Sequence, residues 1–221
     1  MTQTDPSGGH SSGRTIGRKP QRGVSEMAEI HAILDDGYVA HVGFVDSSTG
    51  EPMVIPVAYG RDGDHLLLHG STGSRLFMLL TAGMPVCVTV THLDAMVAAR
   101  SAFNSSMNYR SVMAFGTPRM LDGEKKIQAL RVISDHLIPG IWDAGREMTA
   151  KEYAQTAVAS LALDDVTAKR RTGGSLDEDD AHLPIWAGQI PLVTTFGAPI
   201  ADESAAHLPV PDHVRNLGER A

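Results

Sequence analysis

The stretch MVIPVAYGRDGDHLLLHGSTGSR, residues 53–75, decides the fold. Its two apolar runs, 53–59 and 65–69, are rich in residues that favour strands, and the Asp62-Gly63 pair between them tolerates positive φ. That pattern predicts an antiparallel hairpin. The small residues that follow the second run, with Ser74 in position to cap a helix, predict a strand-to-helix junction at 69–75.

Outward from this stretch, the hydrophobic pattern predicts further short strands and few helices. Ser25 is the expected N-cap of a first helix, and 104–110 is expected to be a polar loop. The expected helices are 25–36, 74–83, 124–137 and a short one opened by a capping box at Thr149 and Glu152. The expected additional strands are 38–45, 85–91, 96–103, 111–119, 157–163 and 185–192. Hairpins without regular βαβ alternation indicate an α+β fold of six or seven antiparallel strands with flanking helices, and closure into a barrel would protect the strand edges.

Composition excludes several classes of protein. The 221 residues are 42% hydrophobic, and 19 basic against 26 acidic residues give a net charge of −7, which argues against a general nucleic-acid binder. No run approaches the ~20 apolar residues of a membrane-spanning helix. The single Cys87 rules out an intrachain disulfide and a Cys-rich zinc site. With no secretory signal in view, we expect a cytoplasmic protein.

The domain expected from the pattern covers residues 23–200. Residues 1–22 are polar and basic, and we interpret them as a disordered, solvated arm, with contact to a partner as the alternative. Residues 201–221 form a polar, Pro-interrupted tail. The acidic loop 172–183 is interpreted as a solvated charge run rather than a metal site.

Metal and nucleophile chemistry find little support. His65 and His69 are four residues apart on a predicted strand, about 13 Å along the chain at ~3.3 Å per residue, so one ion does not bridge them. Cys87 alternates within a Val/Thr strand, as a buried, inert thiol does. The sequence contains no Gly-x-Ser-x-Gly elbow, P-loop or Gly-x-Gly-x-x-Gly fingerprint.

Three polar motifs remain as candidate sites. In HGSTGSR, 69–75, the hydroxyls of Ser71 and Ser74, the first N–H groups of a helix and the Arg75 guanidinium would form an anion cradle. An N-capped surface helix is the alternative. The cluster NYRS, 108–111, offers hydrogen-bond donors beside an aromatic ring. In LPIWAGQIPL, 183–192, the tryptophan is either a core residue or a platform for a ligand.

These motifs, in this order, resemble the pyridoxamine 5′-phosphate oxidase-like FMN-binding split β-barrel superfamily, and within it the flavin-nucleotide-binding branch that includes the nitroimidazole-resistance proteins. The resemblance runs from about residue 22 to 192. It is carried by HVGFVD (41–46), MVIPVAYGRDGDHLLLHGS (53–71), SMNYRSVMAFG (106–116), AKRRTGG (168–174) and LPIWAGQIPL (183–192).

The resemblance implies a homodimer of split barrels that holds two FMN molecules at the subunit interface. The MVIPV strand, with His69 and Gly70, would lie along the isoalloxazine ring, and Ser74 and Arg75 would bind the phosphate. Arg110 and Ser111 would reach the polar edge of the ring, and Trp186 of the other subunit would cover it. The cofactor-binding residues expected from the motifs and the resemblance are Val54, Ile55, Pro56, Val57, His69, Gly70, Ser71, Ser74, Arg75, Asn108, Tyr109, Arg110, Ser111 and Trp186.

The sequence departs from the oxidases that make pyridoxal phosphate. Arg75 is followed by Leu76 instead of Lys, and no Arg/His-rich clamp follows Trp186, so we do not expect that reaction. Lys169 or Arg170 is a candidate for the missing cationic contact, with exposed charges before a Gly-Gly turn as the alternative.

The leading interpretation is an FMN-dependent oxidoreductase acting on a small molecule, in which the flavin supplies the redox chemistry. His69 is a candidate proton donor. A flavin-binding or storage module without turnover is a second interpretation, and a split barrel that binds haem or a deazaflavin is a third.

Overall fold

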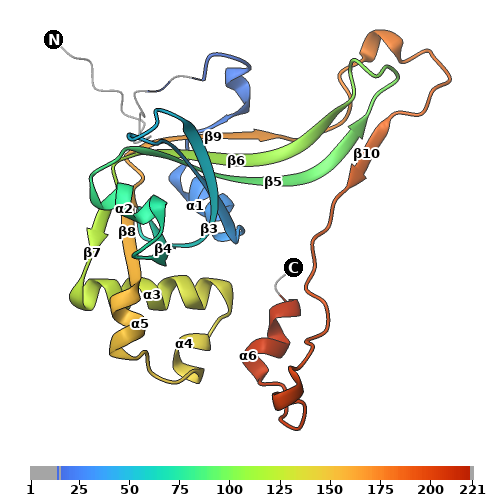
Figure 1. Cartoon of the computed structure of the whole chain (residues 1–221). Helices are drawn as coiled ribbons and strands as arrows, with labels where there is room; N and C mark the ends of the chain where they lie inside the picture. Colours follow the sequence, from blue (N-terminus) through green and yellow to red (C-terminus); the bar gives the residue numbers. More distant parts are fainter. Residues whose placement is uncertain (1–13, 15, 220–221) are drawn as a thin grey trace.

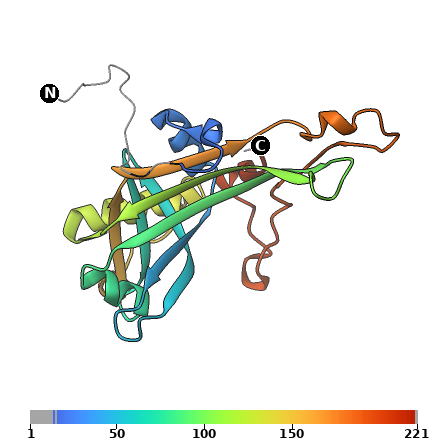
Figure 2. The ribbon, with the colours of Figure 1, turned by 90° about the horizontal axis from the view of Figure 1, so that it is seen from above.

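The fold is one antiparallel sheet that curls into a split barrel and carries a long projecting ribbon (Figures 1 and 2). The computed structural model describes residue 14 and residues 16–219. Within these residues ten strands pair in the order β1-β9-β6-β5-β2-β3-β4-β8-β7, and β10 pairs with β5. The strands are β1 (Gly23–Val24), β2 (Val39–Val45), β3 (Pro52–Asp62), β4 (His65–Ser71), β5 (Val86–Ala98), β6 (Ser106–Gly116), β7 (Arg119–Leu121), β8 (Thr156–Ala162), β9 (Asp165–Arg171) and β10 (Gly188–Pro191).

The barrel closes through β6 and β7, which are almost continuous in the chain. β6 pairs with β5 on one side of the sheet, and β7 pairs with β8 at its far end.

The expected hairpin at Asp62 and Gly63 is present, with Asp62 opposite His65 and Gly63 at φ 52°. Glycine adopts this left-handed conformation readily because it has no Cβ.

The barrel is split where β3 and β4 part. These strands pair only from Tyr59 opposite Leu68 to Asp62 opposite His65. Beyond that point β3 continues along β2, whereas β4 continues along β8 as far as Ser71. The end of β4 that carries His69 is therefore not paired with β3.

The described residues contain six α-helices. They are α1 (Met27–Asp35), α2 (Arg75–Thr81), α3 (Gly123–Leu137), α4 (Ile141–Ala144), α5 (Ala150–Gln155) and α6 (Asp212–Arg215); four 3₁₀ turns, η1 (Pro20–Arg22), η2 (Glu178–Asp180), η3 (Glu203–Ala205) and η4 (Asn216–Glu219), complete the secondary structure. Helices α3, α4 and α5 lie together at the end of the barrel away from the ribbon (Figure 1). None of the described helices is long and apolar enough to cross a bilayer.

Two apolar clusters hold these layers together. The larger fills the barrel and includes Leu34 of α1, Leu66 and Leu68 of β4 and Tyr59 of β3, whose hydroxyl donates to the Leu34 carbonyl. The smaller lies outside the barrel wall and packs Leu67 of β4 against α3. Because Leu66 and Leu68 face inward and Leu67 faces α3, alternation places His65 and His69 on the outer side of β4.

The ribbon formed by β5 and β6 extends well beyond the barrel, with β10 beside β5 (Figures 1 and 2). After β10 the chain runs back toward the barrel, where Phe196 makes an edge contact with Tyr38. We refer to this ribbon together with residues 186–193 as the arm. Large apolar side chains are exposed along it: Met96, Met107, Trp186, Ile190, Leu192 and Val193.

Several sequence-based boundaries are wrong. Glu26 flanks the start of α1 instead of Ser25, and residues 106–110 belong to β6 instead of a loop, because they pair with β5 and β9. β9 was not expected, since its outer half is cationic. Asp177 is 6% exposed and bound to Arg100, so this member of the acidic loop is not solvated. The expected N-cap Ser74 and the capping box at Thr149 are confirmed.

Candidate functional site

The split in the barrel wall brings together part of the predicted cofactor site. Along β3 the side chains alternate: Val54 and Pro56 point outward and are exposed, whereas Ile55 and Val57 pack against the core. A planar ligand lying along this strand would therefore meet the side chains of Val54 and Pro56 and only the backbone of Ile55 and Val57.

His69 lies at the unpaired end of β4. Its Nδ1 atom is buried without a hydrogen-bond partner in the structure. Burial lowers the pKa of His69 because it disfavours the imidazolium, so the ring is neutral at neutral pH. A neutral, unpartnered imidazole is suited to bind a metal centre or to accept a proton from a ligand.

The residues after His69 form the junction to α2. A Cβ on Gly70 would lie 2.5 Å from the ring of Phe77, so this glycine is required by packing. The Ser74 hydroxyl accepts from the Phe77 N–H and caps a helix of only seven residues. The Ser71 hydroxyl accepts from the Gly73 N–H, and Ser71 is exposed.

Arg75 has partners within the protein. Its Nε binds a carboxylate oxygen of Asp46, and its Nη2 donates to the Ser48 hydroxyl at 3.0 Å. Asp46 is only 1% exposed, and the hydrogen bonds from Arg75 and Ser48 lower the pKa of Asp46. Because a carboxylate already balances the guanidinium, the cradle at 69–75 carries less positive charge than the sequence predicts.

The second part of the predicted site lies on β6, which is separated from β3 by β2 and β5. Asn108 is buried and binds the Arg171 guanidinium and the side-chain oxygen of Gln189. Arg110 forms ion pairs with Asp94 and with Asp36, so it fastens α1 to the sheet. These two residues already have protein partners.

Two neighbours on β6 differ from them. Tyr109 is half-buried opposite Arg171, and Ser111 is opposite Lys169 of β9. Ser111 also lines a cavity of about 510 Å³. Ser111 and Tyr109 therefore remain open to a ligand.

Trp186 lies on the arm just before β10 and is 66% exposed. Its ring covers Gly188, where a Cβ would lie 2.8 Å from the indole. The ring is therefore outside the core of its own subunit. Its predicted place over a flavin of the other subunit stays a prediction.

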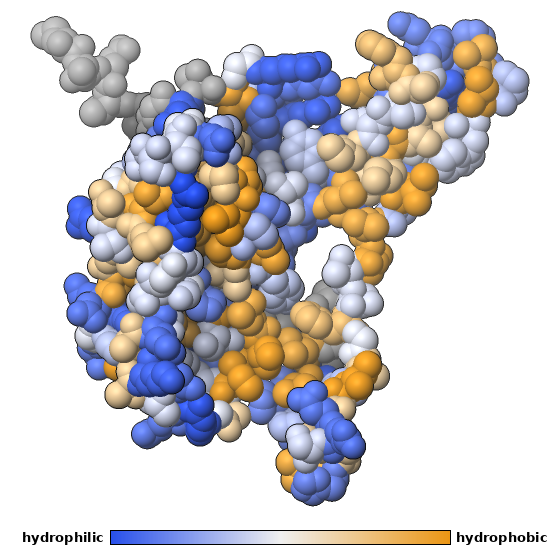
Figure 3. Space-filling model, viewed as in Figure 1, coloured by the Kyte–Doolittle hydropathy of each residue, from blue (hydrophilic) through white to orange (hydrophobic). Residues whose placement is uncertain are grey.

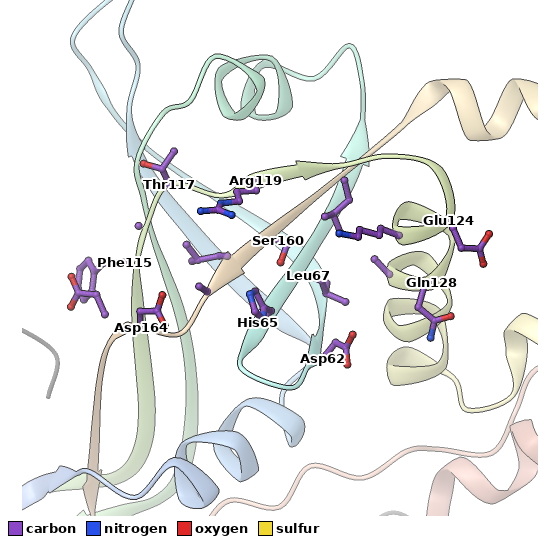
Figure 4. A pocket seen from close by; sticks show the side chains of 17 residues that line it. Asp62, His65, Leu67, Phe115, Thr117, Arg119, Glu124, Gln128, Ser160 and Asp164 are labelled. Carbon is purple, nitrogen blue, oxygen red and sulfur yellow. The ribbon is translucent and has the colours of Figure 1, made fainter. Parts of the chain in front are cut away.

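Two larger cavities, of about 960 and 980 Å³, lie on the side of the barrel that α3 covers. Figure 4 shows the first, in which His65 of β4, Ser160 of β8 and Arg119 of β7 lie near one another. No predicted cofactor residue lines either cavity, so we place the candidate site at the split and not in these cavities. The described residues contain no group of three or more metal-binding side chains.

Comparison with known families fits this architecture. The model of the pyridoxamine 5′-phosphate oxidase family matches residues 26–170. The chain belongs to this family. It shares the split-barrel fold of the family. The matched residues include β3 and β4, between which the barrel is split.

Two of the solved structures that resemble this family member cover about nine tenths of it, and a third covers two thirds. The FAD and haem binding protein from Mycobacterium smegmatis is 38% identical over 89% of this chain and 97% of its own, with a TM-score of 0.85. The flavocytochrome Anf3 from Azotobacter vinelandii is 37% identical over 94% and 97%, with a TM-score of 0.86. A candidate 5-nitroimidazole antibiotic resistance protein from Bacteroides thetaiotaomicron shares the fold at 22% identity, over 67% and 86%, with a TM-score of 0.57. Comparison with curated protein sequences found no significant match.

Two features of the site were missed from the sequence. Asp46 was not expected to bind Arg75, because the two residues are 29 positions apart in the sequence and meet only in the folded protein. Arg171 is 5% exposed and has no carboxylate partner among the described residues. The cationic run at 169–171 was the only signal for it.

Proposed function

We propose that this protein is a redox protein that binds a flavin nucleotide and haem, and that it acts as a flavin-dependent oxidoreductase. The observation that supports haem is His69, a neutral histidine with a buried, unpartnered nitrogen at the split. The two relatives at 37 and 38% identity, one described as binding FAD and haem and the other as a flavocytochrome, support the same pair of cofactors.

The flavin exchanges electrons with substrates and donors, and haem iron exchanges them one at a time. This chain supplies the surface on which they are held. Val54 and Pro56 offer an apolar, exposed strip for the isoalloxazine ring. Ser71, Ser74 and Arg75 are proposed to bind the phosphate of FMN, and Ser111 and Tyr109 to contact the polar edge of the ring.

His69 is the residue that would bind the iron of the haem. Iron binds a neutral imidazole, and burial favours that form of His69. Two other histidines near the barrel have protein partners: His92 binds the Ile33 carbonyl, and His136 binds the Gly37 carbonyl. His41 of β2 lies opposite Pro56 and is exposed, whereas His69 is half-buried. His65 lies on the same face of β4 as His69 but at the far end of the strand.

A homodimer is part of the proposal. The outer face of the sheet and the arm expose large apolar side chains, among them Val45 (58%), Val54 (64%) and Trp186 (66%). Figure 3 shows hydrophobic surface on the ribbon and along the space between the barrel and the C-terminal segment. A second copy that covers these surfaces would place Trp186 beside the cofactor of its partner.

The absorption spectrum of the purified protein tests this directly. We expect flavin bands together with a Soret band, and denaturation followed by chromatography identifies the flavin as FMN or FAD. His69→Ala is expected to remove the Soret band and to keep the flavin, whereas the matched control His65→Ala keeps both. A Soret band that survives His69→Ala would exclude this residue as the ligand.

A flavin protein without haem is the second candidate. It is favoured by the predicted contacts of His69 and Gly70 with the isoalloxazine ring. In that case the spectrum shows flavin bands alone, with no Soret band after reconstitution with hemin. Rapid bleaching of the flavin by NADH or NADPH would then separate an oxidoreductase from a storage module.

A further inference from the structure

Five cations form a cluster at the outer edge of the sheet, and none of the proposed flavin contacts belongs to it. They are Arg18, Lys19, Arg22, Lys169 and Arg171. Lys169 donates to the Arg18 carbonyl at 3.1 Å, and Gly23, next to Arg22, is opposite Lys169 in the β1–β9 pair. Positive charges on neighbouring side chains repel one another, and the binding of an anion between them relieves this repulsion.

The cluster is not neutralised by the part of the protein that the structure describes. None of its five members forms an ion pair with a described carboxylate, although ten other described arginine and histidine residues do. The carboxylates of Asp165 on β9 and Glu29 on α1 are already bound, to Arg14 and to Arg170. An uncompensated cluster is notable in a chain with a net charge of −7.

The electrostatics of two members agree with this geometry. The charges of Arg22, Arg18 and Arg171, together with burial, lower the pKa of Lys19. Arg171 is 5% exposed, and burial followed by the charge of Arg22 lowers its pKa. Its guanidinium donates only to neutral oxygens, those of Asn108, Gly173 and Gly174. A buried guanidinium without a carboxylate is costly unless another anion approaches it.

The backbone at the cluster is also unusual. Lys19 is the single non-glycine residue with positive φ (53°) among the described residues. Such conformations cost energy and are concentrated at functional sites. The residues just before this turn, Ile16 and Gly17, line the cavity of about 510 Å³ together with Lys169 and Ser111, and the strand after it, β1, pairs with β9.

We infer that this cluster binds the diphosphate of a dinucleotide. A diphosphate carries several negative charges on adjacent groups, which match several cations from neighbouring segments better than one. The inference rests on the proposed flavin chemistry for its two possible sources. One source is FAD itself, whose diphosphate follows the flavin. The other is a nicotinamide dinucleotide that delivers electrons to the flavin.

The experiment compares two variants with equal loss of charge. Arg18→Gln/Lys19→Gln removes two exposed cations of the cluster. Arg119→Gln/Lys125→Gln removes two exposed cations that line the cavity in Figure 4 and form no ion pair among the described residues. Calorimetry measures binding of inorganic pyrophosphate, and fluorescence titration of the apoprotein measures riboflavin, FMN and FAD. Flavin-loaded protein is titrated with NADPH.

We expect the cluster variant, and not the control, to weaken pyrophosphate binding about tenfold, with affinity that falls as salt rises. If the cluster variant also loses affinity for FAD but keeps its affinity for riboflavin, the diphosphate is that of FAD. If the cluster variant instead loses affinity for NADPH and keeps its affinity for FAD, the diphosphate is that of the electron donor. Equal affinities of both variants for pyrophosphate, FAD and NADPH would overturn the inference.

Failure of the proposed function gives a different result. If the wild-type protein binds no riboflavin, FMN or FAD, the flavin proposal fails. The pyrophosphate and NADPH measurements on the cluster and control variants do not require that the flavin proposal be correct, so the cluster is still tested.

Discussion

Arg75, the first residue of α2, binds the carboxylate of Asp46, which is 1% exposed at the end of β2. This ion pair joins the β4–α2 junction to the β2–β3 turn, because Ser48 in that turn contacts both Asp46 and Arg75. The pair therefore fixes one side of the split at which the cofactor is proposed to bind.

The Asp46 carboxylate makes acid stability testable. Its pKa is lowered in the folded state by Arg75 and Ser48, so its stabilising contribution is present above the unfolded pKa of about 3.9 and is lost as pH falls toward the folded value. We expect Asp46→Asn to be less stable than wild type at pH 7, with a difference that shrinks below about pH 4. Urea unfolding followed by circular dichroism from pH 7 to 3 measures this. A difference that is constant over the whole range would contradict it, and Asp180→Asn is the control.

The phosphate role of Arg75 requires a background in which the buried carboxylate is already neutral. We therefore compare Asp46→Asn with Asp46→Asn/Arg75→Ala. Hydrogen bonds to charged groups contribute about 1.5–3 kcal/mol, so removing the guanidinium should weaken FMN about ten- to a hundredfold. Riboflavin has no phosphate, and its affinity should change little. Equal losses for both ligands would show that Arg75 only stabilises the fold.

The two tryptophans provide a matched pair. Trp186 is 66% exposed on the arm, whereas Trp142 of α4 packs against the apolar cluster beside α3. We expect Trp186→Leu to change the free energy of unfolding by less than about 0.5 kcal/mol and to relieve quenching of flavin fluorescence. Trp142→Leu should lower stability and leave the quenching unchanged. If Trp186→Leu has no effect on the flavin, the ring does not cover it.

The proposed homodimer depends on the outer face of the sheet. Val54 is 64% exposed on β3, and a charge placed there would be buried without a partner in an interface. Val54→Glu should shift the protein toward monomer in sedimentation velocity at micromolar concentration. Met78→Glu, at a 54% exposed position on α2, is the control. A stable monomer of wild-type protein loaded with flavin would refute the proposal.

Part of the candidate site could be predicted and part could not. The strand-to-helix junction that carries His69, Ser71 and Ser74 is confirmed, since it depends on a cap and a turn within a few residues; its role in binding a cofactor stays a prediction. Asn108 and Arg110 were expected to face a ligand, but their side chains are bound within the protein to Arg171 and to Asp36 and Asp94. Nothing within a few residues of them in the sequence indicates these partners.

The sequence by itself determined the features that depend on neighbours in the chain. The Asp62-Gly63 hairpin, the Ser74 cap and the capping box at Thr149 each arise from contacts a few residues apart. Tertiary structure alone decided that Arg75 meets Asp46, and that the basic segment 18–22 lies beside Lys169 on β9. Both pairs are far apart in sequence. Pairing of β1 with β9 brings the second together, whereas the first meets where the β4–α2 junction contacts the turn after β2.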